Sequence, residues 1–175
     1  FVLGEGSVSL VLETEESAAK RGVKRYAELV GCAVTHKSVE FGTLKGSEEA
    51  MERAIREACA QAGIVPDKLS AICAFGNGHQ ALDNMELCVY TKLFTKAMPI
   101  EVCRSVTGEA RAASAAEQVA FAAQMLSGEF KGTTLVMDTD GIIDDKTVNT
   151  AAFEYVLAVA AGTGGCYSAV VLKKV

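Results

Sequence analysis

The chain has 175 residues, close to the size of a single domain, so one hydrophobic core is expected. Half of the residues are hydrophobic, 22% are charged and the mean hydropathy is +0.23, a composition that excludes a disordered chain. The 17 Lys and Arg against 22 Asp and Glu give a net charge of −5 without a basic run, which excludes nucleic acid or an anionic membrane as the main partner. No apolar run approaches the ~18 residues of a membrane span, and no basic-then-apolar leader is visible, so we expect a cytoplasmic protein without a membrane partner.

The core is expected to be built from small side chains. Aromatic residues make up only 6% of the chain and Trp is absent, whereas Ala and Gly are abundant. The cysteines show no CxxC pair and most lie in apolar runs, so buried reduced thiols are favoured over disulfides or metal ligands, as in a reducing cytosol. These are Cys32, Cys59, Cys73, Cys88, Cys103 and Cys166.

The first third of the chain predicts two strands and two helices. Residues 8–12 are a short apolar strand candidate, and Thr14 is an N-cap for a helix that ends at Gly22. Residues 26–34 predict a second strand, followed by an irregular loop over residues 36–46. Next, Ser47 begins a helix with an apolar stripe that ends at Gly63.

The rest of the chain alternates strands with helices. A buried strand is predicted over residues 69–75, leading into a glycine-rich loop, and Asp83 is expected to cap a helix that reaches about Phe94. Another strand is predicted over residues 100–103, a small-residue helix over 111–126, and further strands over 133–137 and 169–172. This alternation indicates an α/β fold.

A glycine-rich corner and the two histidines are candidate ligand sites, but neither shows the residue pattern that such a site requires. The corner Gly162, Thr163, Gly164 and Gly165 enters a strand rather than opening a helix, and no Lys-Ser or Lys-Thr follows it, so a phosphate loop is not expected. His36 and His79 are 43 residues apart without Cys or carboxylate at ligand spacing, so we expect no metal and no cofactor, and we expect His36 to be a loop histidine.

Two clusters of charged residues are expected to be structural rather than metal-binding or catalytic. The carboxylates of Asp138, Asp140, Asp144 and Asp145 lack the alternating ligands and distal Glu of a calcium loop, so a solvated acidic turn is predicted. Arg104 and Glu109 flank a short turn and are expected to form a structural ion pair on an exposed corner.

Taken together, the motifs resemble the C-terminal half of a β-ketoacyl synthase. The resemblance rests on Phe-Val-Leu-Gly-Glu-Gly at residues 1–6, Leu-Val-Leu-Glu at 10–13, Ala-Ala-Lys-Arg-Gly at 18–22 and Tyr-Ala-Glu at 26–28. It implies an α/β thiolase-like fold, with a mixed β-sheet sandwiched between helices. It also implies that residues 1–13 are the last strand of the N-terminal half of a ketosynthase and that residues 14–175 are the C-terminal domain.

Two positions depart from the family at its catalytic histidines. Where the family has Ala-His-Gly-Thr, this chain has Ala-Phe-Gly-Asn at residues 74–77, with the following Asp83 and Glu86 retained. Where the family has Lys-Ser-x-x-Gly-His, this chain has Arg104 in place of the lysine and Glu109 in place of the histidine. In the family the imidazoles assist decarboxylation and stabilise negative charge, which Phe75 and an ionised Glu109 do not do.

In lacking both histidines the chain resembles the chain length factors, the catalytically inactive partners of ketosynthases in polyketide synthesis. The segment Gly-Gly-Cys-Tyr-Ser-Ala at residues 164–169 is also similar to the ending of those proteins. The resemblance implies a non-catalytic subunit that pairs with a ketosynthase, shapes its product tunnel, meets acyl carrier protein through the complex, and needs a companion chain carrying the N-terminal half. Alternatives are a divergent β-ketoacyl synthase or other acyl-transferring enzyme, with Glu109 or His79 in a new role, and a purely structural partner. No catalytic residue is expected; the tunnel or relic-site candidates are Phe75, Gly76, Asn77, Gly78, His79, Arg104, Glu109, Gly162, Thr163, Gly164 and Gly165.

Overall fold

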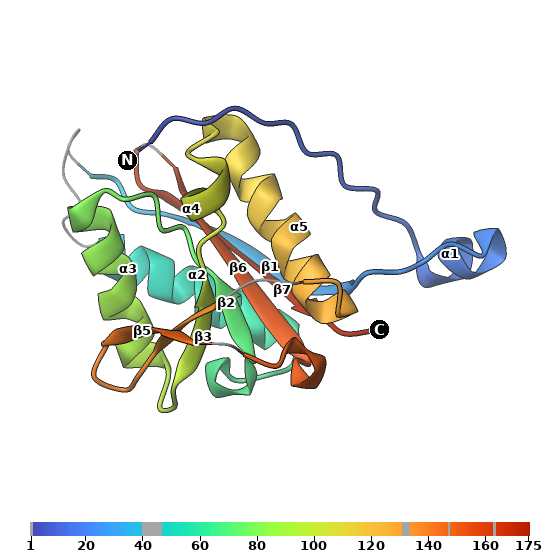
Figure 1. Cartoon of the computed structure of the whole chain (residues 1–175). Coiled ribbons are helices and arrows are strands. Elements are labelled where there is room, and N and C mark those ends of the chain that lie inside the picture. Colours follow the sequence, from blue (N-terminus) through green and yellow to red (C-terminus); the bar gives the residue numbers. More distant parts are fainter. Residues whose placement is uncertain (1, 40–46, 131–133, 147, 163) are drawn as a thin grey trace.

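The computed structural model describes residues 2–39, 47–130, 134–146, 148–162 and 164–175 (Figure 1). Its centre is one mixed sheet whose strands follow the spatial order β1-β7-β6-β2-β3-β4-β5. The strands are β1 (Glu28–His36), β2 (Ala71–Cys73), β3 (Met98–Glu101), β4 (Thr134–Met137), β5 (Ile143–Lys146), β6 (Tyr155–Gly162) and β7 (Cys166–Lys173). Strand β7 is antiparallel to β1 and β6, and β4 is antiparallel to β3 and β5. Strands β1, β6, β2 and β3 therefore run in one direction and end at the same edge of the sheet.

Helices cover both faces of the sheet. Helices α2 (Ser47–Gln61) and α3 (Gln80–Leu93) pack together on one face, and α5 (Ser114–Ser127) lies on the other face against β6 and β2 (Figure 1). The short α4 (Arg104–Thr107) follows β3, and α1 (Glu15–Arg21) projects away from the body at the end of the N-terminal segment. Short 3₁₀ turns occur at η1 (Pro66–Lys68), η2 (Arg111–Ala113) and η3 (Thr150–Ala152).

Close approach around small residues holds helix α2 on the sheet, as the composition predicts. A Cβ atom at Gly31 of β1 would lie 2.1 Å from the carbonyl oxygen of Ala58 in α2. The helix contributes Ala50, Ala54 and Ala58 to the buried core, all at most 1% exposed. Because only a residue without a side chain fits at Gly31, any larger residue there would push the helix off the sheet.

The helices at residues 14–21 and 47–63 are confirmed. Thr14 caps α1 by accepting a hydrogen bond from the backbone of Ser17, and Gly22 ends it in the left-handed conformation. Helix α3 begins three residues before the predicted cap, since the Asp83 carboxylate accepts a hydrogen bond from the Asn77 amide in the preceding loop instead.

Two sequence expectations were wrong, and two strands were not predicted. Residues 8–12 form no strand, because the part of the chain that the structure describes offers that segment no strand to pair with. His36 is not in a loop but is the last residue of β1. Strands β5 and β6 have no counterpart among the predicted elements, although β6 is the central neighbour of β2 and β7.

The acidic turn is confirmed: Asp138 Oδ1 accepts hydrogen bonds from the backbone amides of Asp140 and Ile142. Asp144 and Asp145 lie on the exposed edge strand β5. In the described ranges no set of three or more metal-ligating side chains comes together, and no helix is long and apolar enough to cross a membrane.

Candidate functional site

The predicted site segments meet at one edge of the sheet. Residues 74–79 follow β2, residues 102–109 follow β3, and Gly162 ends β6, so all three segments lie where parallel strands end. A cavity of about 500 Å³ opens there between the loop after β2, helix α3, strand β3 and helix α4. Its walls include Gly76, Tyr90, Val102, Arg104, Val106 and Leu135. This edge is the usual position of binding sites in α/β sheets.

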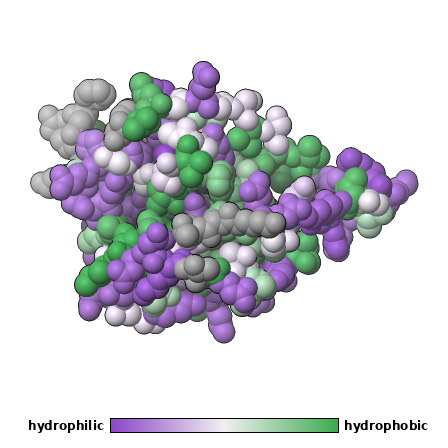
Figure 2. All heavy atoms as spheres, viewed as in Figure 1, coloured by the Kyte–Doolittle hydropathy of each residue, from purple (hydrophilic) through white to green (hydrophobic). Residues whose placement is uncertain are grey.

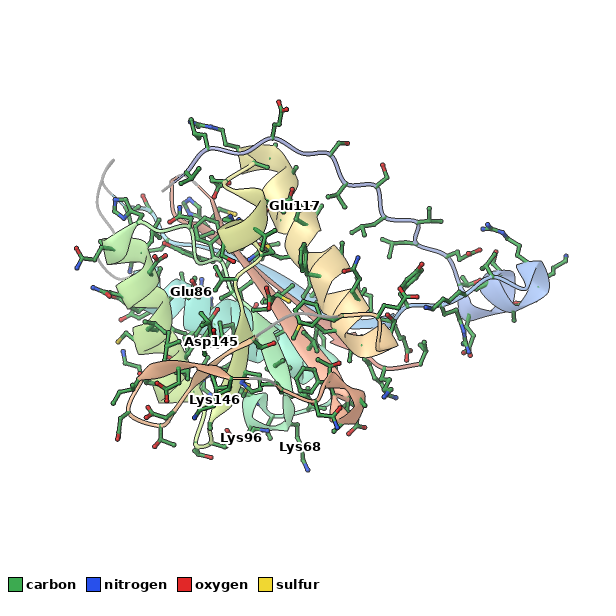
Figure 3. The ribbon with its side chains drawn as sticks, in the orientation of Figure 1. Lys68, Glu86, Lys96, Glu117, Asp145 and Lys146 are labelled. Atoms are coloured by element: carbon green, nitrogen blue, oxygen red, sulfur yellow. The ribbon has the colours of Figure 1, made fainter. Side chains whose placement is uncertain are left out.

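Carboxylates of helix α3 hold the loop that carries Phe75. Glu86 accepts hydrogen bonds from the backbone amides of Phe75 (2.6 Å) and Gly76 (2.9 Å), and from the hydroxyl of Tyr90 (2.5 Å). Burial raises the pKa of Glu86, and these three hydrogen bonds oppose that rise. Figure 3 shows Glu86 where α3 faces the sheet. The two carboxylates retained from the family pattern, Asp83 and Glu86, are therefore positioning residues for the loop.

Arg104 joins the two positions at which the family carries histidines. Its guanidinium carbon lies 4.2 Å from the centre of the Phe75 ring, and its Nη1 donates to the Phe75 carbonyl oxygen. Its Nε lies 2.9 Å from Glu109 Oε2. The N–H of that Nε finds no well-aligned acceptor among the described residues, so the contact with Glu109 is an ion pair rather than a linear hydrogen bond.

Glu109 is fully engaged within the chain. Its Oε1 accepts hydrogen bonds from the Arg111 amide and the Ser114 hydroxyl, both at 2.6 Å. The side chains of Arg104 and Glu109 are only 3% and 9% exposed. The ion pair predicted from the sequence is confirmed, but its predicted place on an exposed corner was wrong: the turn is covered by the N-terminal segment, where the amide of Glu109 donates to the Val2 carbonyl oxygen.

The N-terminal segment is held there by two glycines. A Cβ atom at Gly4 would lie 2.0 Å from the Thr107 carbonyl oxygen, and Gly108 has a φ of +73° and faces the Gly4 backbone. A residue with a side chain at Gly4 would therefore separate the segment from α4. Apart from the glycines themselves, nothing in the sequence pattern indicates this contact.

The remaining candidates contribute backbone rather than chemistry. His79 is exposed and precedes α3, and its backbone amide donates to Asn77 Oδ1. Gly76 and Gly78 have positive φ values that shape the loop. Gly164 and Gly165 form the turn into β7, as predicted, and Thr163 lies outside the described residues.

Gln118 of α5 is a site residue that the sequence did not reveal. Its fully buried amide nitrogen donates to the carbonyl oxygens of Ala74 (2.6 Å) and Val159 (2.5 Å), one from the end of β2 and one from β6. It thereby ties α5 to the edge of the sheet that carries Phe75. In the sequence it is one polar residue on an apolar helix, which does not distinguish it from an exposed glutamine.

The buried thiols are poor nucleophiles. All six cysteines are free, and Cys59, Cys73 and Cys103 are buried as expected, whereas Cys32 and Cys88 are exposed and Cys166 is partly exposed. Burial raises the pKa of Cys59 and of Cys103 to about 11, and that of Cys73 also lies well above its ordinary value. Burial likewise raises the pKa of Glu101 to about 7.

The arrangement can hold an apolar or neutral group but offers no imidazole. Of the ionisable groups in the cavity wall, Glu86 is occupied by the loop backbone and Glu109 by Arg104. The described residues of the cavity wall thus include no histidine to donate a hydrogen bond to a developing oxyanion.

Known proteins are similar to this chain in sequence and in structure. The family model for the beta-ketoacyl synthase C-terminal domain matches residues 26–137, more than half of the chain. The tetracenomycin polyketide synthase ketoacyl synthase alpha subunit of Streptomyces glaucescens is 31% identical over 182 residues, covering 99% of this chain and 43% of that protein. The 3-oxoacyl-(acyl-carrier-protein) synthase 1 of Haemophilus influenzae is 28% identical over 181 residues, with 99% and 43% covered. This chain thus spans less than half the length of these relatives.

Solved structures share the fold. A type II polyketide synthase acyl-carrier protein in complex with its ketosynthase bound to the hexaketide matches with a TM-score of 0.79 at 26% identity, covering 93% of this chain and 42% of that one. The ishigamide ketosynthase/chain length factor matches with a TM-score of 0.81 at 23% identity, covering 99% and 44%. The thiolase-like fold with its mixed sheet between helices is confirmed, and this chain belongs to the β-ketoacyl synthase family, of which it carries the C-terminal domain.

Proposed function

We propose that this chain is a non-catalytic subunit of the chain length factor type, which pairs with a ketosynthase and shapes its tunnel for polyketide or fatty-acyl elongation. The observation that carries the proposal is the closed contact between Phe75, Arg104 and Glu109. An ionised carboxylate has no hydrogen to donate to an enolate, and the oxygens of Glu109 are already engaged by Arg104, the Arg111 amide and the Ser114 hydroxyl.

The buried thiols agree with this assignment. The nucleophile of a ketosynthase must be available as a thiolate, and burial disfavours that form at Cys73 and Cys103, the two cysteines nearest to the site strands. The matched complexes of a ketosynthase with a chain length factor and with an acyl-carrier protein support the same kinds of partner for this chain.

The alternative is a divergent β-ketoacyl synthase. It is favoured by the relatives themselves, since one is named an alpha subunit and another a 3-oxoacyl-(acyl-carrier-protein) synthase. In that case Glu109 or His79 would have a new catalytic role.

A companion polypeptide is part of the proposal. Leu10, Val11 and Leu12 are exposed although they form an apolar run, and α5 carries no charged side chain on its outward face. Figure 2 shows hydrophobic side chains at the surface between the N-terminal segment and α5. Apolar surface of this kind marks an interface. We expect size-exclusion chromatography with light scattering to find the chain in a larger assembly; a monodisperse monomer with cooperative unfolding would contradict the companion.

Acyl loading separates the two functions. The complex with the ketosynthase that co-purifies with this chain is incubated with acyl-loaded carrier protein, and adducts are mapped by mass spectrometry. We expect acyl groups on a cysteine of the ketosynthase and none on this chain. The control replaces the ketosynthase nucleophile by alanine, which should abolish condensation; condensation that persists would assign catalysis to this chain instead.

A further inference from the structure

His36 and Cys166 stand opposite each other where β1 ends and β7 begins. The strand register pairs these two residues, and at the next position the Lys37 amide donates to the Gly165 carbonyl oxygen at 2.8 Å. Hydrogen-bonded and non-hydrogen-bonded pairs alternate along an antiparallel ladder, so His36 and Cys166 form a non-hydrogen-bonded pair, the kind whose side chains approach most closely.

Both side chains leave the core on the same face. Their neighbours Thr35 and Tyr167 are buried toward α2, where the Thr35 hydroxyl donates to the Ala50 carbonyl oxygen. Because side chains alternate along a strand, His36 and Cys166 lie on the opposite face of the sheet. His36 is exposed there and Cys166 is partly exposed.

The backbone fixes this pairing and leaves the thiol approachable. Gly165 has a φ of +84°, and a Cβ atom there would lie 2.1 Å from the Lys37 carbonyl oxygen, so the two strands meet at contact distance. On the other side of Cys166, its partner in β6 is Gly162, which has no side chain to cover the sulfur.

We propose that Cys166 and His36 form a thiol–imidazole pair that reacts with low-molecular-weight disulfides, making Cys166 a site of reversible S-thiolation. The imidazole accepts the thiol proton, and the thiolate sulfur attacks one sulfur of the disulfide. The disulfide bond of the reagent breaks, a mixed disulfide forms at Cys166, and the leaving thiolate takes the proton from the imidazolium. The side chains are not hydrogen-bonded in the described rotamers, but cross-strand Cβ atoms about 4.5–5.5 Å apart allow contact by side-chain rotation.

The other exposed cysteines provide matched comparisons. Cys32 is on the same strand as His36 but faces Val170, and Cys88 lies on α3 without a histidine three or four positions away. Both are more exposed than Cys166, so exposure alone would rank Cys166 behind them.

The test treats the protein, in the assembly in which it purifies, with oxidised glutathione at pH 7.5 and follows each cysteine by peptide mass spectrometry. We expect the mixed disulfide to form first at Cys166, and His36→Gln to slow that site roughly tenfold or more while Cys32 and Cys88 keep their rates. Val34→Gln, on the same face of β1, is the control and should change nothing. His36→Asn repeats the test should His36→Gln unfold, which labelling of the buried Cys59 would reveal.

Equal rates at Cys166, Cys32 and Cys88, or a Cys166 rate that is the same without His36, would overturn the proposal. The assay needs neither a ketosynthase nor a carrier protein. Its outcome is therefore independent of the proposed function.

Discussion

Replacing Glu109 by glutamine tests whether the candidate site is a closed, buried ion pair. The two donors at Oε1, the Arg111 amide and the Ser114 hydroxyl, would retain the amide oxygen of the new side chain. Its NH₂ group would then face the Arg104 guanidinium, placing donor against donor. Removing one partner of a buried pair leaves an uncompensated charge, so Glu109→Gln should lower the free energy of unfolding by about 3–5 kcal/mol.

The measurement is urea unfolding, followed by circular dichroism at fixed protein concentration, of the protein in the form in which it purifies. The matched control is Glu52→Gln, since Glu52 pairs with Arg56 at 2.8 Å but on the solvent side of α2. That pair should contribute about 0–1 kcal/mol. Adding Arg104→Met to Glu109→Gln should recover part of the loss, because the buried charge is then gone.

A Glu109→Gln variant that loses no more stability than Glu52→Gln would refute this reasoning. The turn after β3 would then be solvated, as the sequence alone predicts, and Glu109 would not be held in a buried ion pair. The main argument for a catalytically silent site would fall with it.

Three further predictions follow from single contacts. Phe75→Ala should lower the free energy of unfolding by about 3–5 kcal/mol, because the ring is buried. The control is Phe121→Ala, at a half-buried phenylalanine, and an equal or smaller loss for Phe75→Ala than for this control would contradict the prediction. Burial raises the pKa of Glu101 from 4.5 to about 7, so the folded state holds the proton more tightly and the free energy of unfolding falls as pH rises through this range. Glu101→Gln should flatten that decline in urea titrations between pH 5 and 8, and an unchanged slope would exclude this carboxyl as its source. Gly4→Ala should detach the N-terminal segment, so that amide hydrogen exchange at Glu109 speeds up; unaltered protection would show that the segment tolerates the added Cβ.

Local signals predicted the helices better than the strands. Helix α2 was found because its apolar stripe and its first-turn carboxylates specify a helix without help from the rest of the chain. Strand β6 was missed because both its faces are covered, so it shows a run of small apolar residues without alternation. Strand β5 is exposed and charged, and only its pairing with β4 makes it a strand.

The residues of the site were predicted from the sequence, but their burial was not. The family resemblance placed Phe75, Arg104 and Glu109 together, and the structure brings them into contact. Their burial depends on residues 2–6 crossing the turn and on the start of α5, where Glu117 lies beside α4 (Figure 3). Such tertiary cover leaves no local pattern, which is why the turn looked like an exposed corner.

Three of the departures from the family pattern, at Phe75, Arg104 and Glu109, form one structural unit. A flat guanidinium can lie over the Phe75 ring while its Nη1 reaches the Phe75 carbonyl oxygen and its Nε faces Glu109. A lysine ammonium, a single compact charge, could not make all three contacts. Aromatic ring, guanidinium and carboxylate therefore depend on one another for their positions.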